Sequence, residues 1–214
     1  MSQAEKLEPN PPQTQPAPTT PLIHDLLRTR WSPRAFSSAP VEDEKLGALF
    51  EAARWAPSGG NAQPWRFLLT RRGTPSFDKL HDCLMRGNKP WTETVPVLVL
   101  AVAETQFPAK GDKPARSNPT ALHDLGMAFA NLTLQATELG LHVHPMAGFD
   151  AGRVKEAFDI PAPFEPVTVT AVGYLASSET LPESLLEREE APRIRSPLRE
   201  TVFEDAWDRP ADFV

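Results

Sequence analysis

Residues 95–103 read VPVLVLAVA, an uninterrupted apolar run that is typical of a strand buried on both faces of a sheet. A second run, VTVTAVGYL at residues 167–175, has the same character, and residues 65–70 and 142–146 are shorter candidates for strands. Because helical periodicity separates these strands, the pattern predicts a layered α/β or α+β domain. The expected helices cover residues 22–27, 41–55, 75–85, 120–139 and 153–158.

The helix expected over residues 120–139 carries small or apolar residues on most of its faces, among them Leu125, Ala128 and Phe129. A helix that is apolar all round is buried on several sides. In a chain of 214 residues, a second subunit is one way to supply that burial. Gly140 follows directly and is a good residue to end the helix.

The composition limits the class of protein. The 214 residues are 40% hydrophobic and 23% charged, which suits one folded domain. The net charge of −6 argues against a nucleic-acid partner and against a polybasic membrane-surface protein. No apolar run is long enough for a transmembrane helix. The single cysteine, Cys83, excludes an internal disulfide and a four-ligand zinc site, and we expect a cytoplasmic protein.

The two ends of the chain differ from its middle. Residues 1–20 are rich in Pro, Gln and Thr and contain no apolar segment that resembles a secretory signal. This composition predicts a flexible arm, which either has no role or binds a partner. Residues 21–200 hold the periodic segments and predict the folded domain. Residues 201–214 predict a C-terminal extension, in which aromatic residues indicate docking onto another surface.

Two basic clusters are candidates for an anion site. Arg30, Ser32 and Arg34 alternate, so an extended backbone would present all three on one side, and Pro33 favours that conformation at Ser32. Two guanidiniums and a hydroxyl suit a phosphate or carboxylate. Arg193 and Arg195 form a second pair far along the chain. Each cluster alone is also compatible with solvated surface charge.

Two loops are candidates for ligand contacts. Residues 56–65 read APSGGNAQPW, in which paired glycines allow close backbone approach and Asn61 and Gln63 offer amide hydrogen bonds. An ordinary helix-to-strand turn is the alternative. At the end of an expected strand, Gly148 allows a backbone N–H to face a ligand, while Asp150 suits a helix N-cap.

Several classes of chemistry lack their motifs. The sequence contains no G-x-G-x-x-G after a strand, no phosphate-binding P-loop, no H-E-x-x-H and no G-x-S-x-G. His142 and His144 alternate on an expected strand, but strand filler or surface is the better interpretation than a metal site. Cys83 is expected to be a buried, inert thiol within a helix.

In this order, four segments over residues 22–200 resemble the FMN-dependent nitroreductase family. They are Arg-x-Ser-x-Arg-x-Phe at residues 30–36, Ala-Pro-Ser-x-x-Asn-x-Gln-Pro-Trp at residues 56–65, Asp-x-Gly-x-Ala-x-x-Asn-Leu at residues 124–132, and Gly-Phe-Asp at residues 148–150 followed by Val-Gly-Tyr and Arg-x-Pro-Leu. The resemblance implies an α+β fold: a three-layer sandwich with a central mixed sheet flanked by helices, in an intertwined homodimer.

The resemblance also implies FMN sites at the dimer interface. The phosphate and ribityl chain would be held by Arg30, Trp31 (mainly through its backbone), Ser32, Arg34, Arg193 and Arg195. The partner chain would supply Pro57, Ser58, Gly59 and Asn61. Pro145, Met146, Ala147 and Gly148 would pass the flavin ring, with a backbone N–H near N5. Trp31 and Ala147 depart from the family's usual residues, and Lys89 is a further candidate for the flavin edge.

The implied activity is a ping-pong reaction. NADH or NADPH would bind transiently and reduce FMN, and a nitroaromatic, quinone or related small-molecule acceptor would then take the hydride. No catalytic side chain and no metal are expected, because the flavin carries the chemistry. The alternative is a protein of the same fold that binds or consumes flavin without NAD(P)H-dependent reductase activity. A third possibility is an interaction protein that has lost FMN, which the retained basic residues argue against.

Overall fold

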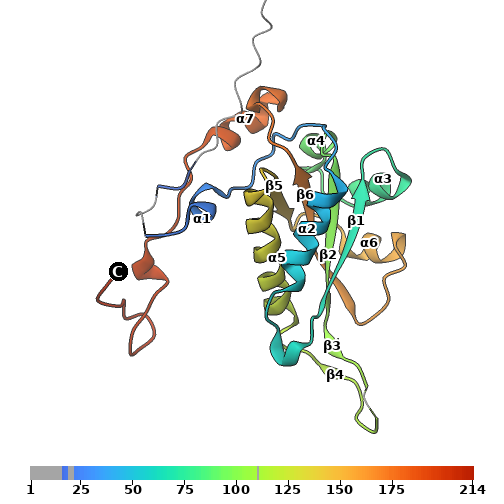
Figure 1. The fold of residues 1–214 in the computed structure, drawn as a ribbon, viewed down its shortest axis with the longest axis vertical. Coiled ribbons are helices and arrows are strands. Elements are labelled where there is room, and N and C mark those ends of the chain that lie inside the picture. Colours follow the sequence, from blue (N-terminus) through green and yellow to red (C-terminus); the bar gives the residue numbers. More distant parts are fainter. Residues whose placement is uncertain (1–15, 19–21, 110) are drawn as a thin grey trace, which may run out of the picture.

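The computed structural model describes residues 16–18, 22–109 and 111–214. Its main sheet has four strands in the order β1-β2-β6-β5 (Figure 1). All four expected strands are confirmed. Their bounds are Trp65–Arg71 for β1, Val97–Glu104 for β2, His142–Met146 for β5 and Phe164–Gly173 for β6.

The expectation of a mixed sheet is wrong for the described chain, because every neighbouring pair in this sheet is antiparallel. Arg71, the last residue of β1, pairs with Val97, the first residue of β2. The intervening helices α3 (Pro75–Asp82) and α4 (Lys89–Thr92) therefore form an out-and-back excursion instead of a parallel crossover. The same holds for α6 (Ala151–Ala157), which lies between β5 and β6.

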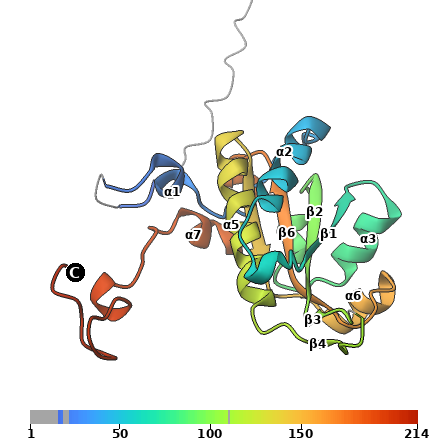
Figure 2. The same ribbon diagram turned by 60° about the horizontal axis from the view of Figure 1, so that its bottom comes forward.

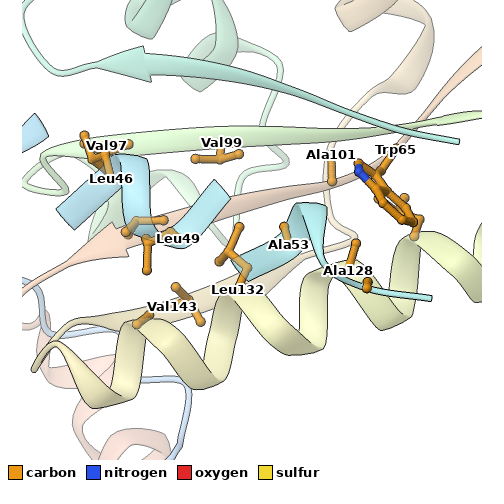
Figure 3. Packing of buried hydrophobic residues seen from close by; sticks show 14 of the residues in the cluster. Leu46, Leu49, Ala53, Trp65, Val97, Val99, Ala101, Ala128, Leu132 and Val143 are labelled. Atoms are coloured by element: carbon orange, nitrogen blue, oxygen red, sulfur yellow. The ribbon is translucent and has the colours of Figure 1, made fainter. Parts of the chain in front are cut away.

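Helices cover both faces of the sheet, which confirms the α+β class and the three layers (Figures 1 and 2). Helices α2 (Asp43–Arg54) and α5 (Ala121–Glu138) pack on one face, and α3 and α6 pack on the other. Strand β2 is buried from Val97 to Ala103, with alternate residues entering the two cores. Val97, Val99 and Ala101 face α2 and α5, where they meet Leu49 and Leu132 (Figure 3). Its intervening residues Leu98, Leu100 and Val102 enter the other core.

Two local signals in the sequence are confirmed at helix ends. Gly140 has a positive φ of 72° and donates its N–H to Thr137 O, and Leu141 donates to Ala136 O. This pair of bonds is the Schellman ending of α5. At the start of α6, the Asp150 carboxylate accepts the N–H of Arg153 as its N-cap.

Other elements differ from expectation. Helix α1 covers Asp25–Thr29, later than expected, because the His24 side chain caps it. Helix α3 ends at Asp82, so Cys83 is its C-cap and not a mid-helix residue. Residues 105–119, expected to be a loop, contain the two-stranded ribbon of β3 (Gln106–Phe107) and β4 (Arg116–Ser117). The charged tail contains an unexpected helix, α7 (Glu183–Glu190), and the short helices η2 (Ser178–Thr180) and η3 (Leu198–Glu200).

The chain after α7, residues 191–214, extends away from the layered body and is called the C-terminal segment below (Figures 1 and 2). Several of its apolar side chains face solvent in the single chain, including Ile194, Leu198, Trp207 and Phe213. Of the predicted N-terminal arm, only residues 16–18 are described, and Ala17 donates its N–H to Arg28 O. No described helix is both long and apolar enough to cross a membrane.

Candidate functional site

A cavity of about 330 Å³ lies where the segment after α1 meets the segment that follows α7. The structure therefore joins the two basic clusters, which are more than 150 residues apart in the sequence. Both predicted groups contribute to the wall. The lining residues include Arg30, Trp31, Ser32, Arg34, Arg188, Glu189, Arg193 and Arg195.

The guanidiniums of this cavity repel one another. Burial lowers the pKa of Arg30, and the charge of Arg195 lowers it further. Burial also lowers the pKa of Arg193, and the charges of Arg30 and Arg195 add to that effect. Arg30 donates to the Ser32 hydroxyl over 3.3 Å, so one cation and one hydroxyl already converge. Such a cluster gains stability from a bound anion, because charge-assisted hydrogen bonds would replace the mutual repulsion.

Arg193 also makes hydrogen bonds that stabilise the cavity wall. Its guanidinium donates to Arg28 O over 3.0 Å and to Arg30 O over 2.7 Å. These bonds tie the segment after α7 to the segment after α1. Arg193 therefore braces the cavity wall in addition to bringing a positive charge to it.

Two residues that the sequence interpretation did not assign to the site hold the Pro33–Arg34 backbone. The buried Glu189 carboxylate accepts the N–H of Arg34 and of Ala35. From the other side, the Nδ1–H of His144 donates to Pro33 O over 2.7 Å. The carbonyl can only accept, which fixes this tautomer. Burial lowers the pKa of His144 to about 4, so the imidazole is neutral at pH 7.

Trp31 lies beside this segment and packs edge-on against His142, with ring centroids 6.2 Å apart. The indole Nε1 of Trp31 and the Nδ1 of His142 are buried and have no hydrogen-bond partner among the described residues. Burial lowers the pKa of His142. Burial therefore favours the neutral form of both histidine rings beside the cavity segment.

The predicted loop at residues 57–61 lies at the other end of α5. The Gly59 N–H donates to the buried Asp124 carboxylate in the first turn of that helix, and the Ser58 hydroxyl accepts the N–H of Gln63. Gly60 and Asn61 both have positive φ, which explains the need for glycine and asparagine there. Pro57, Gly59 and Asn61 are exposed.

This loop does not meet the cation-lined cavity within one chain. The cavity segment contacts the start of β5 through Trp31 and His142, just beyond the last turn of α5. An 18-residue helix is about 27 Å long, so the loop and the cavity lie at opposite ends of a rigid spacer (Figure 1).

The segment predicted to pass the flavin ring is accessible in part. Pro145 and Ala147 are exposed, but the Met146 side chain is buried in the core beneath α3 and α6, so only its main chain remains for a ligand. Gly148 O accepts from Met85 N and Asn88 Nδ2. A Cβ at residue 148 would lie 2.7 Å from Asn88 Nδ2, which favours glycine there. The Gly148 N–H makes no hydrogen bond within the described part of the chain.

The comparisons with known proteins agree with this geometry. Residues 27–82 and 74–174 match the model of the nitroreductase family. The chain belongs to the nitroreductase family. The resemblance drawn from its motifs is thus confirmed.

Individual relatives of this nitroreductase-family chain cover most of its length. A solved structure described as an oxidoreductase containing FMN is 34% identical, covers 89% of this chain and 96% of its own, and has a TM-score of 0.85. A nitroreductase family protein from Clostridium difficile is 27% identical, with a TM-score of 0.64 over 85% of this chain and 96% of its own. A Ralstonia nicotianae protein named "Putative NADH dehydrogenase/NAD(P)H nitroreductase" is 29% identical over 86% of this chain and 99% of its own. These relatives support an oxidoreductase.

Proposed function

We propose that this chain is an FMN-dependent oxidoreductase that uses NADH or NADPH to reduce a small-molecule acceptor such as a nitroaromatic or a quinone. The observation that carries the proposal is the cavity in which Arg30, Arg34, Arg193 and Arg195 converge. An anion with two negative charges, such as the FMN phosphate, would relieve the repulsion among Arg30, Arg193 and Arg195. The 34% identical structure described as containing FMN supports this assignment.

The residues present fit the rest of the cofactor. Arg30, Ser32, Arg34 and Arg195 would hold the phosphate, while Arg193 braces the wall. The free N–H of Gly148 and the exposed main chain at Pro145 and Ala147 would face the flavin ring. When bound, FMN supplies the acceptance and donation of hydride. The protein binds and orients the flavin, and no side chain needs to act as an obligatory acid or base.

The site would be completed by a second copy of the chain. The loop with Pro57, Ser58, Gly59 and Asn61 lies one helix length from the cavity of its own chain, so it would face the cofactor of a partner. One face of α5 supports this arrangement, because Leu122, Gly126, Met127 and Ala130 are exposed in the single chain. The exposed apolar residues of the C-terminal segment would pack on the same partner.

The alternative proposal is a protein that binds or consumes flavin without NAD(P)H-dependent activity. It would use the same cavity. NAD(P)H dependence rests on the names of relatives such as the Ralstonia protein, whereas flavin binding rests on the cavity itself.

The deciding experiment is the visible absorption spectrum of the purified protein before and after anaerobic addition of NADH or NADPH. We expect a flavin spectrum that bleaches on addition and returns with an acceptor. A flavin spectrum that persists would favour the alternative. A protein that is colourless and does not take up added FMN would contradict both.

A further inference from the structure

Glu189 is a buried acid in a cavity wall that otherwise carries positive charge. Only 4% of its surface is exposed. Both carboxylate oxygens lie 2.9 Å from Arg34 N, and one lies 3.1 Å from Ala35 N. The Arg34 guanidinium is farther away, with Nη1 3.8 Å from Oε2. Two backbone amides therefore lie within hydrogen-bond distance of this carboxylate, and both are nearer to it than the Arg34 guanidinium.

Two consecutive amides aimed at one carboxylate fix the backbone at Arg34. The dihedral angles between those amides set the direction of the Arg34 Cα–Cβ bond, and hence where its guanidinium enters the cavity. His144 holds the preceding carbonyl, that of Pro33, from the other side. The segment is thus fixed from two elements, α7 and β5.

The position of Glu189 permits two opposite effects on anion binding. As a bare negative charge in the wall, it would repel a phosphate and weaken binding. As the group that orients Arg34, it would strengthen binding because the guanidinium is preorganised. The geometry favours the second effect, since the carboxylate points at main-chain N–H groups within hydrogen-bond distance.

We propose that Glu189 is a positioning residue of the phosphate site and acts through Arg34. It does not touch the cofactor. The inference rests on the proposed function, namely that FMN occupies the cavity with its phosphate on the arginines.

The test compares FMN with riboflavin, which lacks the phosphate, on apo-protein by quenching of flavin fluorescence. Glu189→Gln keeps the size and one acceptor oxygen but replaces the other with an NH₂ that cannot accept. We expect the Kd of FMN to rise about five- to tenfold, because Arg34 keeps its charge and loses only part of its preorganisation, with the Kd of riboflavin unchanged. Glu187→Gln, an exposed acid on the same helix, is the matched control and should change neither.

A double-mutant cycle tests the route through Arg34. Arg34→Ala should raise the Kd of FMN on its own, and adding Glu189→Gln to it should then change that Kd less than twofold. An undiminished effect in the Arg34→Ala background would overturn the proposal. So would tighter or unchanged FMN binding in Glu189→Gln, or equal losses for FMN and riboflavin.

Two further outcomes keep the test decisive. If Glu189→Gln does not fold, Glu189→Asp keeps the charge but withdraws it by one methylene. If Glu189 positions Arg34, that variant should lose its preference for FMN over riboflavin. An unchanged preference would overturn the proposal. If the unmodified protein binds FMN no better than riboflavin, the phosphate assignment itself fails and the role of Glu189 fails with it. A preference for FMN that Glu189→Gln leaves intact overturns the role of Glu189 alone.

Discussion

The two halves of the proposed site lie at opposite ends of α5. They differ in how much of each is assembled within a single chain. At the C-terminal end, the cation-lined cavity is assembled by one chain, and its backbone is held by His144, Glu189 and Arg193. At the N-terminal end, the loop with Gly59 is held by Asp124 and lies one helix length away from that cavity. This difference teaches that one chain assembles the proposed anion site from its own residues, whereas the loop needs a second chain to take part in the proposed site.

The largest effect expected is at the cavity end and depends on pH. Burial lowers the pKa of His144 to about 4 in the folded chain, below the ordinary 6.5 that the unfolded chain retains. Between these values the unfolded chain binds the extra proton, so stability falls as the pH drops from about 6.5 towards 4. The loss reaches up to about 3 kcal/mol.

Urea unfolding of the protein and of His144→Asn checks this at pH 7 and pH 5. The asparagine keeps an N–H donor for Pro33 O but does not titrate. The pH dependence of the unfolding free energy should therefore be smaller in His144→Asn. Identical pH dependence in both proteins would contradict the assignment.

The next largest effect is expected from a substitution in the proposed anion site that leaves the loop at residues 57–61 unchanged. Arg30→Ala should raise the Kd of FMN about 10- to 100-fold, because it removes a charge-assisted bond from a partly buried anion site, and should leave riboflavin binding unchanged. Titration with each flavin measures this. Arg54→Ala, which removes an exposed arginine paired with Glu51 on α2, is the matched control and should bind both flavins normally.

A smaller effect is expected at the loop end, and it should differ in kind. Asp124→Ala removes the acceptor for the Gly59 N–H and the Thr120 hydroxyl, which should cost about 1–2 kcal/mol of stability. Because the loop would contact the flavin and not the phosphate, FMN and riboflavin should lose affinity equally. Denaturant midpoints and the two flavin titrations test this. If only the affinity for FMN falls, the loop end would not differ from the cavity end in which part of the cofactor it contacts.

The smallest effect on the chain itself is expected in the C-terminal segment. Trp207 is 88% exposed and packs only beside Phe203 in the described chain, so Trp207→Ala should change its intrinsic stability by less than about 0.5 kcal/mol. If the segment packs on a partner, self-association measured by sedimentation should weaken nonetheless. Unaltered self-association would remove the segment from the interface.

Much of the layered fold could be predicted from the sequence, because its signals are local. Buried strands are continuous apolar runs, and the endings at Gly140 and Asp150 depend on neighbours within five residues. Helix α7 is not evident in the sequence because its residues, ESLLEREE, are mostly charged, and besides Glu189 it buries only Leu185 and Leu186 in part. The mixed sheet was implied by the family resemblance, and the sequence pattern could not correct it, because a helix between strands does not reveal whether the chain returns to the same end.

The site was predictable where residue type alone carries the chemistry, as for Arg30, Ser32 and Arg34. Glu189 was not, because its partners lie 154 and 155 residues away and a glutamate in a charged helix is usually solvated. His144 was dismissed as strand filler, since its bond to Pro33 O exists only after β5 and the cavity segment come together. A single sequence does not indicate which distant residues form hydrogen bonds with each other in the folded chain.

The most direct test of the account is whether one FMN site uses two chains. Arg30→Ala damages the cavity, and the double variant Ser58→Ala/Asn61→Ala damages the loop. Each protein alone should retain little FMN. Co-expressed with two different affinity tags, they give a mixed dimer in which one site has both halves intact. The account predicts that the purified mixed dimer binds one FMN. A mixed dimer that binds no more FMN than either variant would contradict it, because both halves of each site would then belong to the same chain.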